Sequence, residues 1–306
     1  MPAVSVVKRG ETASTSYRGP SGGCWPWGRM PTIRSRQLLE VISGAVHCVS
    51  WPAFRPVATP AHDQYAAALG AGCTREGDLL LSCGTAWVLL LTTRQPITDR
   101  ASSFIPGPHV QPAHWGLMGV ISSGSATLDR VLVLTGGRAD FDRIDAAVAD
   151  VPAGSGGVIV IPHLLGRTLP TRDAHARGAI LGLSQGHRRE HLWRAAMEGL
   201  ACETRAACDY LRQRGAAVSE LRMVGGATRS PIWPRIIASV LGVPVLTQSG
   251  GDIAVRGAAC LAARALGRQD LPAAEAWSSH GPIAEWREPY QELYARYQDA
   301  VTRLES

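Results

Sequence analysis

The spacing of apolar and polar residues along the chain changes near residue 57. Before that point Gly, Ser, Pro and Arg follow one another without a sustained period, so residues 1–50 are expected to form an irregular, disordered, basic head. After it, helical and strand-like periods alternate as far as the C-terminus. The pattern therefore predicts one structured domain over residues 51–306.

The strongest helical period covers residues 189–214, where small and apolar residues recur on one face and charged residues on the other. Further helices are expected over 63–72, 124–134, 231–241, 254–266 and 289–304. Strands are expected over 78–93 (two strands around a turn at Gly84), 115–122, 158–162, 221–224 and 243–246. Alternating strands and helices joined by short links indicate the α/β class.

The net charge of +6 is concentrated in the head. Residues 1–60 hold seven Lys and Arg against two Glu, a net charge of +5, which leaves +1 for the rest of the chain. The domain is therefore not expected to bind nucleic acid. Lys8 is the only lysine in the sequence, which excludes both a Walker A lysine and a Schiff-base lysine from the domain.

Seven cysteines are scattered without a Cys-x-x-Cys pair. A disulfide framework and a zinc site are therefore not expected, and the cysteine pattern fits a reducing compartment. The longest apolar runs, such as residues 87–91, are far short of the ~20 residues that a membrane span requires. The first 30 residues lack the apolar core of a signal peptide. We therefore expect a cytoplasmic protein without a membrane partner.

Residues 224–244 are the most informative stretch of the chain. A predicted strand ends in Gly225-Gly226, a polar turn follows, and a predicted helix begins near Pro231. Because glycine has no Cβ, a ligand can lie against this backbone, and a helix N-terminus offers unpaired N–H groups to a nucleotide. An ordinary strand–turn–helix connection has the same spacing, so both interpretations stay open on the pattern alone.

Two further motifs contain residue types that suit catalysis and phosphate binding. Asp63 opens the predicted helix over 63–72, where it is either a helix cap or an exposed carboxylate available for chemistry. Gly84-Thr85 occupies the turn between two predicted strands. Gly84 would permit a phosphate to approach, and Thr85 would donate hydrogen bonds to it, although Gly-Thr is also common in ordinary β-turns.

Four motifs resemble, in their order and spacing, the C-terminal half of the FGGY family of carbohydrate kinases. They are Ala-His-Asp-Gln-Tyr-Ala-Ala-Ala-Leu-Gly-Ala-Gly at 61–72, Leu-Ser-Cys-Gly-Thr-Ala at 81–86, Ser-Gly-Ser-Ala-Thr-Leu at 123–128, and Gly-Gly-x-x-x-Ser-x-x-Trp with Leu-Gly-x-Pro-Val at 225–245. The resemblance implies a ribonuclease H-like fold of the actin and hexokinase type. The first string is most similar to xylulokinase-like members.

The resemblance also implies a reaction. A family member transfers the γ-phosphate of ATP, with Mg²⁺, to a hydroxyl of a small-molecule sugar such as a ketose or polyol. Asp63 matches the catalytic base that takes the proton from that hydroxyl. Gly84 and Thr85 match the turn that approaches the phosphates.

The remaining site residues are implied on the nucleotide side. Gly124 and Leu128 match positions that pack on the ribose and base. Gly225 and Gly226 would lie against the nucleotide, and Ser230 would lie near the adenine. No residue of this half is expected to bind a metal ion.

Two positions are less regular. Arg167 stands where the family usually has an acid. His187 and His191 are four residues apart, a spacing that can bind a metal, but the absence of a third ligand in the neighbouring sequence favours ordinary surface histidines.

The first domain of the family carries an Asp-x-Gly-Thr phosphate loop and most of the sugar contacts. Residues 1–50 do not resemble it, so we expect that domain to be absent and the kinase to be truncated. The alternative is a non-catalytic nucleotide-binding remnant, or a half-module that needs a separate first domain or assembles as a homo-oligomer. The sequence does not identify the sugar.

Overall fold

A computed structural model describes residues 49–50, 56–57, 61–136, 141–248, 252–268 and 276–305. The head expected over residues 1–50 lies outside these ranges except for β1 (Val49–Ser50), which pairs with β2 (Pro56–Val57). The irregularity of the head therefore stays a prediction.

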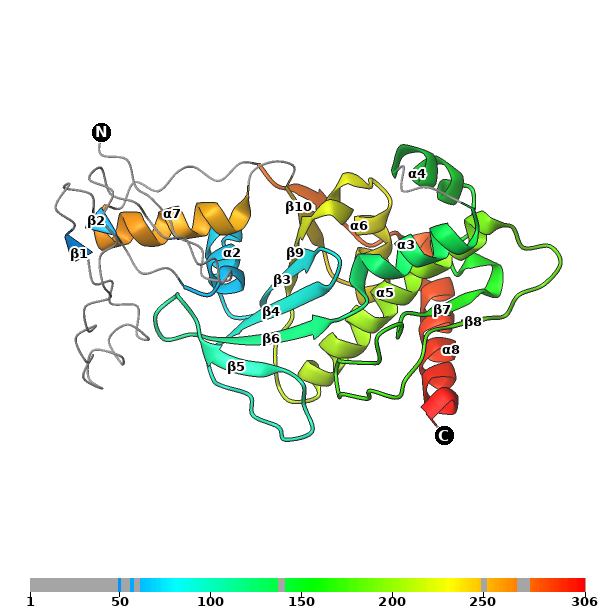
Figure 1. The fold of residues 1–306 in the computed structure, drawn as a ribbon, viewed down its shortest axis with the longest axis horizontal. Helices are drawn as coiled ribbons and strands as arrows, with labels where there is room; N and C mark the ends of the chain where they lie inside the picture. Colours follow the sequence, from blue (N-terminus) through cyan, green and yellow to red (C-terminus); the bar gives the residue numbers. More distant parts are fainter. Residues whose placement is uncertain are drawn as a thin grey trace, which may run out of the picture.

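A mixed seven-stranded sheet forms the centre of the domain (Figure 1). Its strands in spatial order are β11 (Ser278–His280), β10 (Val245–Thr247), β9 (Glu220–Gly225), β3 (Asp78–Cys83), β4 (Trp87–Thr93), β6 (Trp115–Ile121) and β5 (Ile105–Pro108). The central strands β3, β9 and β10 are parallel, and the strands outside them pair antiparallel. A separate ribbon pairs β7 (Ile159–Ile161) with β8 (Ala179–Leu181).

Helices cover both faces of this sheet. The helices are α2 (Asp63–Ala71), α3 (Gly124–Leu134), α4 (Phe141–Ala149), α5 (Arg189–Arg212), α6 (Trp233–Leu241), α7 (Ile253–Ala265) and α8 (Arg287–Glu305), with the 3-10 turns η1 (Ser155–Gly157), η2 (Gly226–Arg229) and η3 (Ala284–Trp286). Figure 1 shows α2 and α7 together at one end of the molecule, and α3, α5, α6 and α8 gathered at the other. This is the α/β layering that the alternating pattern predicts.

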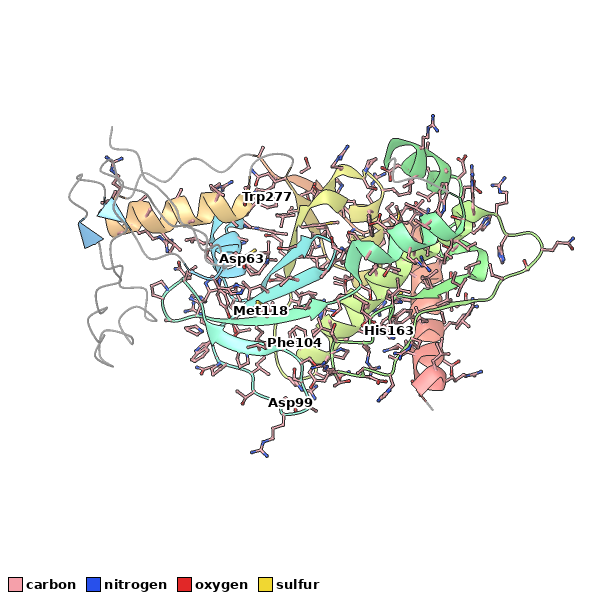
Figure 2. All side chains as sticks on the ribbon, viewed as in Figure 1. Asp63, Asp99, Phe104, Met118, His163 and Trp277 are labelled. Atoms are coloured by element: carbon pink, nitrogen blue, oxygen red, sulfur yellow. The ribbon has the colours of Figure 1, made fainter. Side chains whose placement is uncertain are left out.

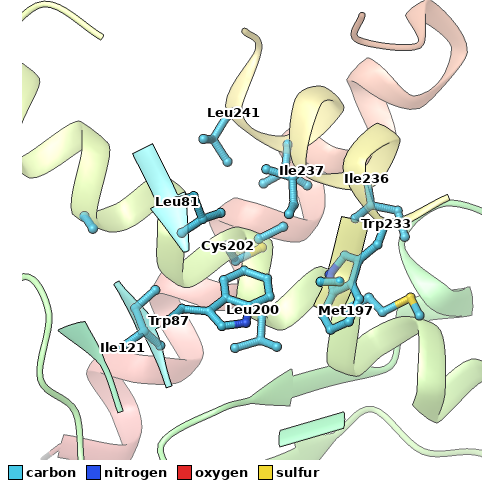
Figure 3. Packing of buried hydrophobic residues seen from close by; sticks show 14 of the residues in the cluster. Leu81, Trp87, Ile121, Met197, Leu200, Cys202, Trp233, Ile236, Ile237 and Leu241 are labelled. Carbon is cyan, nitrogen blue, oxygen red and sulfur yellow. The ribbon is translucent and has the colours of Figure 1, made fainter. Parts of the chain in front are cut away.

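The central strands are apolar on both faces because both faces are covered. Leu79 and Leu81 of β3 belong to the large core under α5 and α6, whereas Leu80 belongs to a smaller core under α2 and α7. In the large core the rings of Trp87 and Trp233 lie 5.4 Å apart (Figure 3). Because both faces of β3 and β4 are buried, these strands lack the alternation of apolar and polar residues that a strand with one exposed face shows.

The smaller core depends on a close crossing of α2 and α7. A Cβ added at Gly257 of α7 would overlap the carbonyl oxygen of Ala66, and one added at Gly70 of α2 would overlap the carbonyl oxygen of Ile253. Glycine in the middle of a helix lowers its stability by about 1 kcal/mol relative to alanine. Both glycines therefore have a packing role, because each lets the backbone of the other helix approach closely.

The large core lies next to a buried pair of charged residues, Arg194 and Glu198. The Arg194 guanidinium donates to Glu198 at 2.8 Å, and both Arg194 and Tyr290 of α8 bond to the same acid. Burial raises the pKa of Glu198, and the Arg194 charge opposes that rise. Removing one partner of a buried pair leaves an uncompensated charge, so this network ties α8 to α5.

Most of the predicted elements are confirmed, and six helices and strands were missed, among them the short β1 and β2. The helices over 63–72, 124–134, 189–214, 254–266 and 289–304 and the strands within 78–93 are present to within a few residues. The helix expected from 231 begins at Trp233, after η2. The structure adds α4, β5, β8 and β11. Within the described ranges no helix is both long enough and apolar enough to cross a membrane.

Candidate functional site

Two predicted turns meet at one edge of the sheet. β3 and β9 are adjacent and parallel, and Cys83 is the register partner of Gly225. Both strands end there, so the turn at Gly84-Thr85 and the turn that begins at Gly226 leave the sheet side by side. The carboxyl ends of parallel strands are the usual position of a ligand site in α/β sheets.

The Gly84-Thr85 turn is exposed but held in place. The Ser125 N–H donates to the Gly84 carbonyl at 3.2 Å, and the Ala126 N–H donates to the Thr85 carbonyl at 3.3 Å. The indole N–H of Trp87, at the start of β4, donates to Ser125 Oγ at 3.0 Å. The first turn of α3 therefore fixes the backbone of this turn, which leaves it rigid and open to a ligand.

The two adjacent glycines of the second turn are not equivalent. Gly225 has a φ of +96°, and a Cβ there would lie 2.5 Å from the carbonyl oxygen of Cys83. Gly226 is exposed and has no heavy atom within 4 Å of the position that a Cβ would take. Gly225 is thus required by the sheet, whereas the open backbone at Gly226 leaves room for a ligand.

Ser230 was expected at the start of a helix, but it follows η2 and precedes the first residue of α6 by three positions, and its side chain is buried. Its hydroxyl accepts a hydrogen bond from the Trp233 N–H at 3.0 Å and donates one to the Asp145 carboxylate of α4. The hydroxyl is therefore occupied by helix capping and by the link to α4. A contact between Ser230 and an adenine stays a prediction, and it would have to use something other than this hydroxyl.

Gly124 and Leu128 are also enclosed. A Cβ at Gly124 would lie 2.6 Å from the Trp87 nitrogen, so this glycine lets α3 approach β4. Leu128 is only 2% exposed and belongs to the large core. Both residues position the wall of the site, and their contact with a ribose or base stays a prediction.

Asp63 begins α2, and its side chain is 44% exposed. Its carboxylate accepts a hydrogen bond from the Gln64 N–H at 2.8 Å and lies 3.0 Å from His62 Nδ1. His62 is the N-cap residue and accepts from the same N–H at 3.3 Å. Asp63 therefore helps to cap the helix, and its carboxylate is also open to solvent.

A contact that the sequence did not reveal ties the first turn of α2, where Asp63 lies, to the strand that leads into the Gly84-Thr85 turn. Ser82 Oγ, one residue before the end of β3, donates to Gln64 Oε1 at 2.9 Å. Ser82 pairs with Val88 of β4, and Val88 pairs with Val120 of β6. Ser82, Val88 and Val120 thus form one row across three strands, and all three side chains are half-buried. Leu80, in the next row under α2, is by contrast fully buried. The row of Ser82, Val88 and Val120, which we call the floor row, is therefore partly open. Figure 2 shows Asp63 next to Met118, a residue of the neighbouring row, in that view.

No metal centre is formed by the described residues, because they contain no group of three His, Cys, Asp or Glu. The ring centroids of His187 and His191 lie 5.1 Å apart, and the rings are tilted by 58° to each other. His187 bonds to the Gly156 carbonyl and to the Ser184 N–H, which agrees with the surface-histidine interpretation.

The arrangement combines an exposed carboxylate with two open backbone turns at one sheet edge. Backbone N–H groups in tight turns suit the oxygens of phosphates, and an exposed carboxylate can take a proton from a hydroxyl. The large core behind the turns keeps the two strand ends in fixed positions. The edge can therefore hold a phosphate-bearing ligand next to a proton acceptor.

Comparisons with known proteins agree with this geometry. The chain is 36% identical over 293 residues to a glycerol kinase from Citrifermentans bemidjiense, covering 90% of this chain and 56% of that protein. It is 27% identical over 201 residues to the xylulose kinase of Bacillus subtilis, covering 66% of this chain and 40% of that protein. The chain spans about half the length of the curated relatives it matches.

Solved structures show the same fold. A xylulose kinase from Rhodospirillum rubrum superposes with a TM-score of 0.75 at 30% identity, covering 83% of this chain and 53% of that one. A Brucella ovis structure described as a xyloylose kinase gives 0.79 at 28% identity, covering 86% and 57%. The predicted actin- and hexokinase-type α/β fold is therefore confirmed.

The model of the FGGY family of carbohydrate kinases, C-terminal domain, matches residues 79–266, which is more than half of the chain. That range includes the Gly84-Thr85 turn and the Gly225-Gly226 turn, although Asp63 precedes it. The chain therefore belongs to the FGGY family of carbohydrate kinases.

Proposed function

We propose that this chain provides the ATP-binding half of a carbohydrate kinase and that Asp63 is its catalytic base. The observation that carries the proposal is the position of Asp63, which is exposed and linked through Gln64 and Ser82 to the strand that leads into the Gly84-Thr85 turn. A base must lie close to both the acceptor hydroxyl and the phosphate it attacks.

The proposed step is an in-line phosphoryl transfer. The Asp63 carboxylate takes the proton of the acceptor hydroxyl as its oxygen bonds to the γ-phosphorus, and the bond from that phosphorus to the β–γ bridging oxygen breaks, so that ADP leaves. The Gly84-Thr85 turn holds the phosphates, and the open backbone at Gly226 lies along the nucleotide. The rigidity of both turns fixes the attacking geometry, which is the main contribution of the protein in such a transfer.

The residues fit ATP better than they fit a metal ion held by protein alone. A Cβ at Gly84 would meet only one heavy atom within 4 Å, and one at Gly226 would meet none, so both leave space for a nucleotide. Mg²⁺ commonly binds one or two carboxylates together with substrate phosphates. The described part of this chain offers no three-ligand cluster, so we propose that Mg²⁺ arrives with the nucleotide.

The acceptor is proposed to be a small polyol or ketose. Glycerol and xylulose appear in the names of the relatives, and both belong in the first substrate panel. Because the chain spans about half the length of those relatives, activity through a homo-oligomer or with a separate first domain is also part of the proposal. A nucleotide-binding module without transfer activity is the alternative.

The test is ADP release by the purified chain with Mg-ATP, across glycerol, xylulose and related ketoses and polyols. We expect sugar-dependent release that falls by ~10²–10⁴-fold in Asp63→Asn, because the variant can no longer take the proton. Asp299→Asn on α8 is the matched control, since it removes an exposed carboxylate far along the chain from the site.

Three outcomes separate the alternatives. Turnover that survives Asp63→Asn would contradict the role of Asp63. Binding of a nonhydrolysable ATP analogue without turnover in any oligomeric form would support the non-catalytic module. Failure to bind the analogue, by a chain whose circular dichroism shows it to be folded, would overturn the proposed function.

A further inference from the structure

Ser123 occupies the N-cap position of α3, but its hydroxyl does not cap that helix. A serine at this position usually accepts a hydrogen bond from the N–H of the second or third helical residue. Here those two N–H groups, of Ser125 and Ala126, donate instead to the carbonyls of the Gly84-Thr85 turn. That turn therefore caps α3, and the Ser123 hydroxyl is left for another partner.

The partner comes from the loop over residues 162–170, which follows β7. The Leu165 N–H donates to Ser123 Oγ at 3.1 Å, and Ser123 is only 2% exposed. The Gly166 N–H donates to the His163 carbonyl at 3.2 Å and closes the turn that presents the Leu165 N–H. The 162–170 loop thus holds the residue from which α3 begins.

The second half of the 162–170 loop is attached to the end of β6. The Thr168 hydroxyl donates to the carbonyl of Val120, in the floor row, and accepts from the Ser122 N–H at 3.3 Å. Leu169 is fully buried in the large core. These contacts fix the C-terminal part of the loop, so the orientation of its first turn depends on His163.

His163 anchors the start of the loop between α5 and α8. Its Nε2 lies 3.1 Å from Glu203 Oε2 of α5, and the Tyr297 hydroxyl of α8 donates to the same oxygen at 2.6 Å. All three side chains are buried, and Figure 2 shows His163 next to α8 in that view. A hydrogen bond between buried groups is costly to break, because the partner left behind is shielded from water.

We propose that His163 is a positioning residue for the phosphates of the nucleotide. The proposal rests on the proposed function, which places those phosphates at the Gly84-Thr85 turn. The bond between His163 and Glu203 fixes the Leu165 N–H. Through Ser123, this N–H fixes the first turn of α3, whose N–H groups hold the two carbonyls of the Gly84-Thr85 turn. His163 thus acts on the phosphates through other residues and without touching them.

The first measurement follows the turn without any nucleotide. Hydrogen exchange at the Ser125 N–H reports on its bond to the Gly84 carbonyl. His163→Phe removes the bond to Glu203 and keeps a ring in the buried position, so exchange at Ser125 should accelerate about tenfold. Exchange at Ala258 of α7 should stay unchanged, since α7 packs on the other face of the sheet.

The second measurement compares two ligands that differ in their phosphates. A nonhydrolysable ATP analogue and adenosine share the nucleoside, but only the analogue reaches the Gly84-Thr85 turn. In isothermal titration calorimetry, His163→Phe should raise the Kd of the analogue about tenfold and that of adenosine by less than about twofold. His163→Gln, whose amide can still donate to Glu203, should restore the Kd of the analogue. A general loss of stability would not distinguish the two ligands.

Ser123→Ala tests the connection between His163 and the turn. It removes the acceptor of the Leu165 N–H and should weaken binding of the analogue to a similar extent. The double variant with His163→Phe should lose no more than either single variant, because residues of one network are not additive. His187→Phe is the matched control, since His187 Nε2 bonds to the Gly156 carbonyl of η1 at the same 3.1 Å. It should leave the exchange and both dissociation constants unchanged.

Four results would each overturn the positioning role: unchanged exchange at Ser125 in His163→Phe, equal losses for the analogue and adenosine, no rescue by His163→Gln, or additive losses in the double variant. Failure of the unchanged chain to bind the analogue would instead contradict the proposed function. Accelerated exchange at Ser125 would in that case retain the link from His163 to the turn and remove only its role toward a nucleotide.

Discussion

Glycines at two regions of the molecule have opposite surroundings. At the crossing of α2 and α7, a side chain on Gly70 or Gly257 would overlap the backbone of the other helix. At the sheet edge, Gly84 is exposed, and a side chain on Gly226 would enter open space. The first pair is explained completely by packing, whereas the open glycines have no such explanation. An open glycine on a rigid turn is therefore the better indication of a ligand.

The same contrast occurs within one dipeptide. Gly225 has a positive φ and lies against Cys83, so the sheet requires it. Gly226, the next residue, is free of such constraints. A Gly-Gly motif thus combines one structural and one accessible position, and substitutions distinguish the two.

The largest effect on stability is expected where α2 crosses α7. Gly257→Val should lower the free energy of unfolding by about 3 kcal/mol or more, because α7 must move away from Ala66 to admit the side chain. Urea denaturation followed by circular dichroism measures the loss. Gly281→Val is the control, since no heavy atom lies within 4 Å of its Cβ position. Equal stability of the two variants would refute the packing role of Gly257.

A smaller effect is expected at His109, on the α2 side of the sheet, where acid should lower the free energy of unfolding. His109 is buried beside the Tyr65 ring of α2, and its Nε2 has no hydrogen-bond partner among the described residues. Burial, together with the nearby charges of His114 and Arg264, lowers the pKa of His109 from 6.5 to about 4. Below pH 6.5 the unfolded chain therefore takes up a proton that the folded chain resists.

The folded state should consequently lose stability as the pH falls from about 6.5 towards 4. Between pH 7 and pH 5 the contribution of His109 is about 2 kcal/mol. Urea denaturation at the two pH values should show a smaller decrease in His109→Gln than in the unchanged chain. His175→Gln, at an exposed histidine, should retain the full decrease. An identical decrease in all three proteins would contradict the assignment to His109.

The smallest effect on stability is expected at Gly226, in the turn that follows β9. Gly226→Val should change the free energy of unfolding by no more than about 0.5 kcal/mol, as for an unconstrained surface position. It should weaken binding of an ATP analogue by about tenfold, because the new side chain occupies the space above the turn. Isothermal titration calorimetry and urea denaturation on the same preparation give both quantities.

Gly225→Ala sharpens this comparison. Its φ of +96° is unfavourable for alanine, and the methyl group would press on Cys83, so a loss of about 1–3 kcal/mol in stability is expected. If Gly226→Val were the more destabilising of the two, the distinction between structural and accessible glycines would be wrong.

Elements with strong local patterns were predictable. The long period of α5 and the apolar runs of β3 and β4 appear close to their expected bounds. Two of the missed strands, β5 and β11, lack such signals, because β5 contains two prolines and β11 is Ser-Ser-His. Proline and polar residues are unfavourable in a strand interior and are tolerated at sheet edges, which is where both strands lie.

The site was predictable in its parts and less so in its contacts. The residue types at Asp63, Gly84 and Gly226 indicated a ligand, and the structure leaves all three exposed. The buried hydroxyl of Ser230 was not predictable, because its partner Asp145 lies 85 residues away in a helix that the pattern missed. Gln64 and Ser82 likewise have no local signal for their contact.

The strongly periodic helices and strands, the α/β class and the family motifs could be read from the sequence alone, because periodicity and motif spacing are local properties. The parallel pairing of β3 with β9, which brings Gly84 and Gly226 to one edge of the sheet, follows only from the tertiary structure. Register between distant strands depends on how the whole core packs, and no short stretch of sequence contains it.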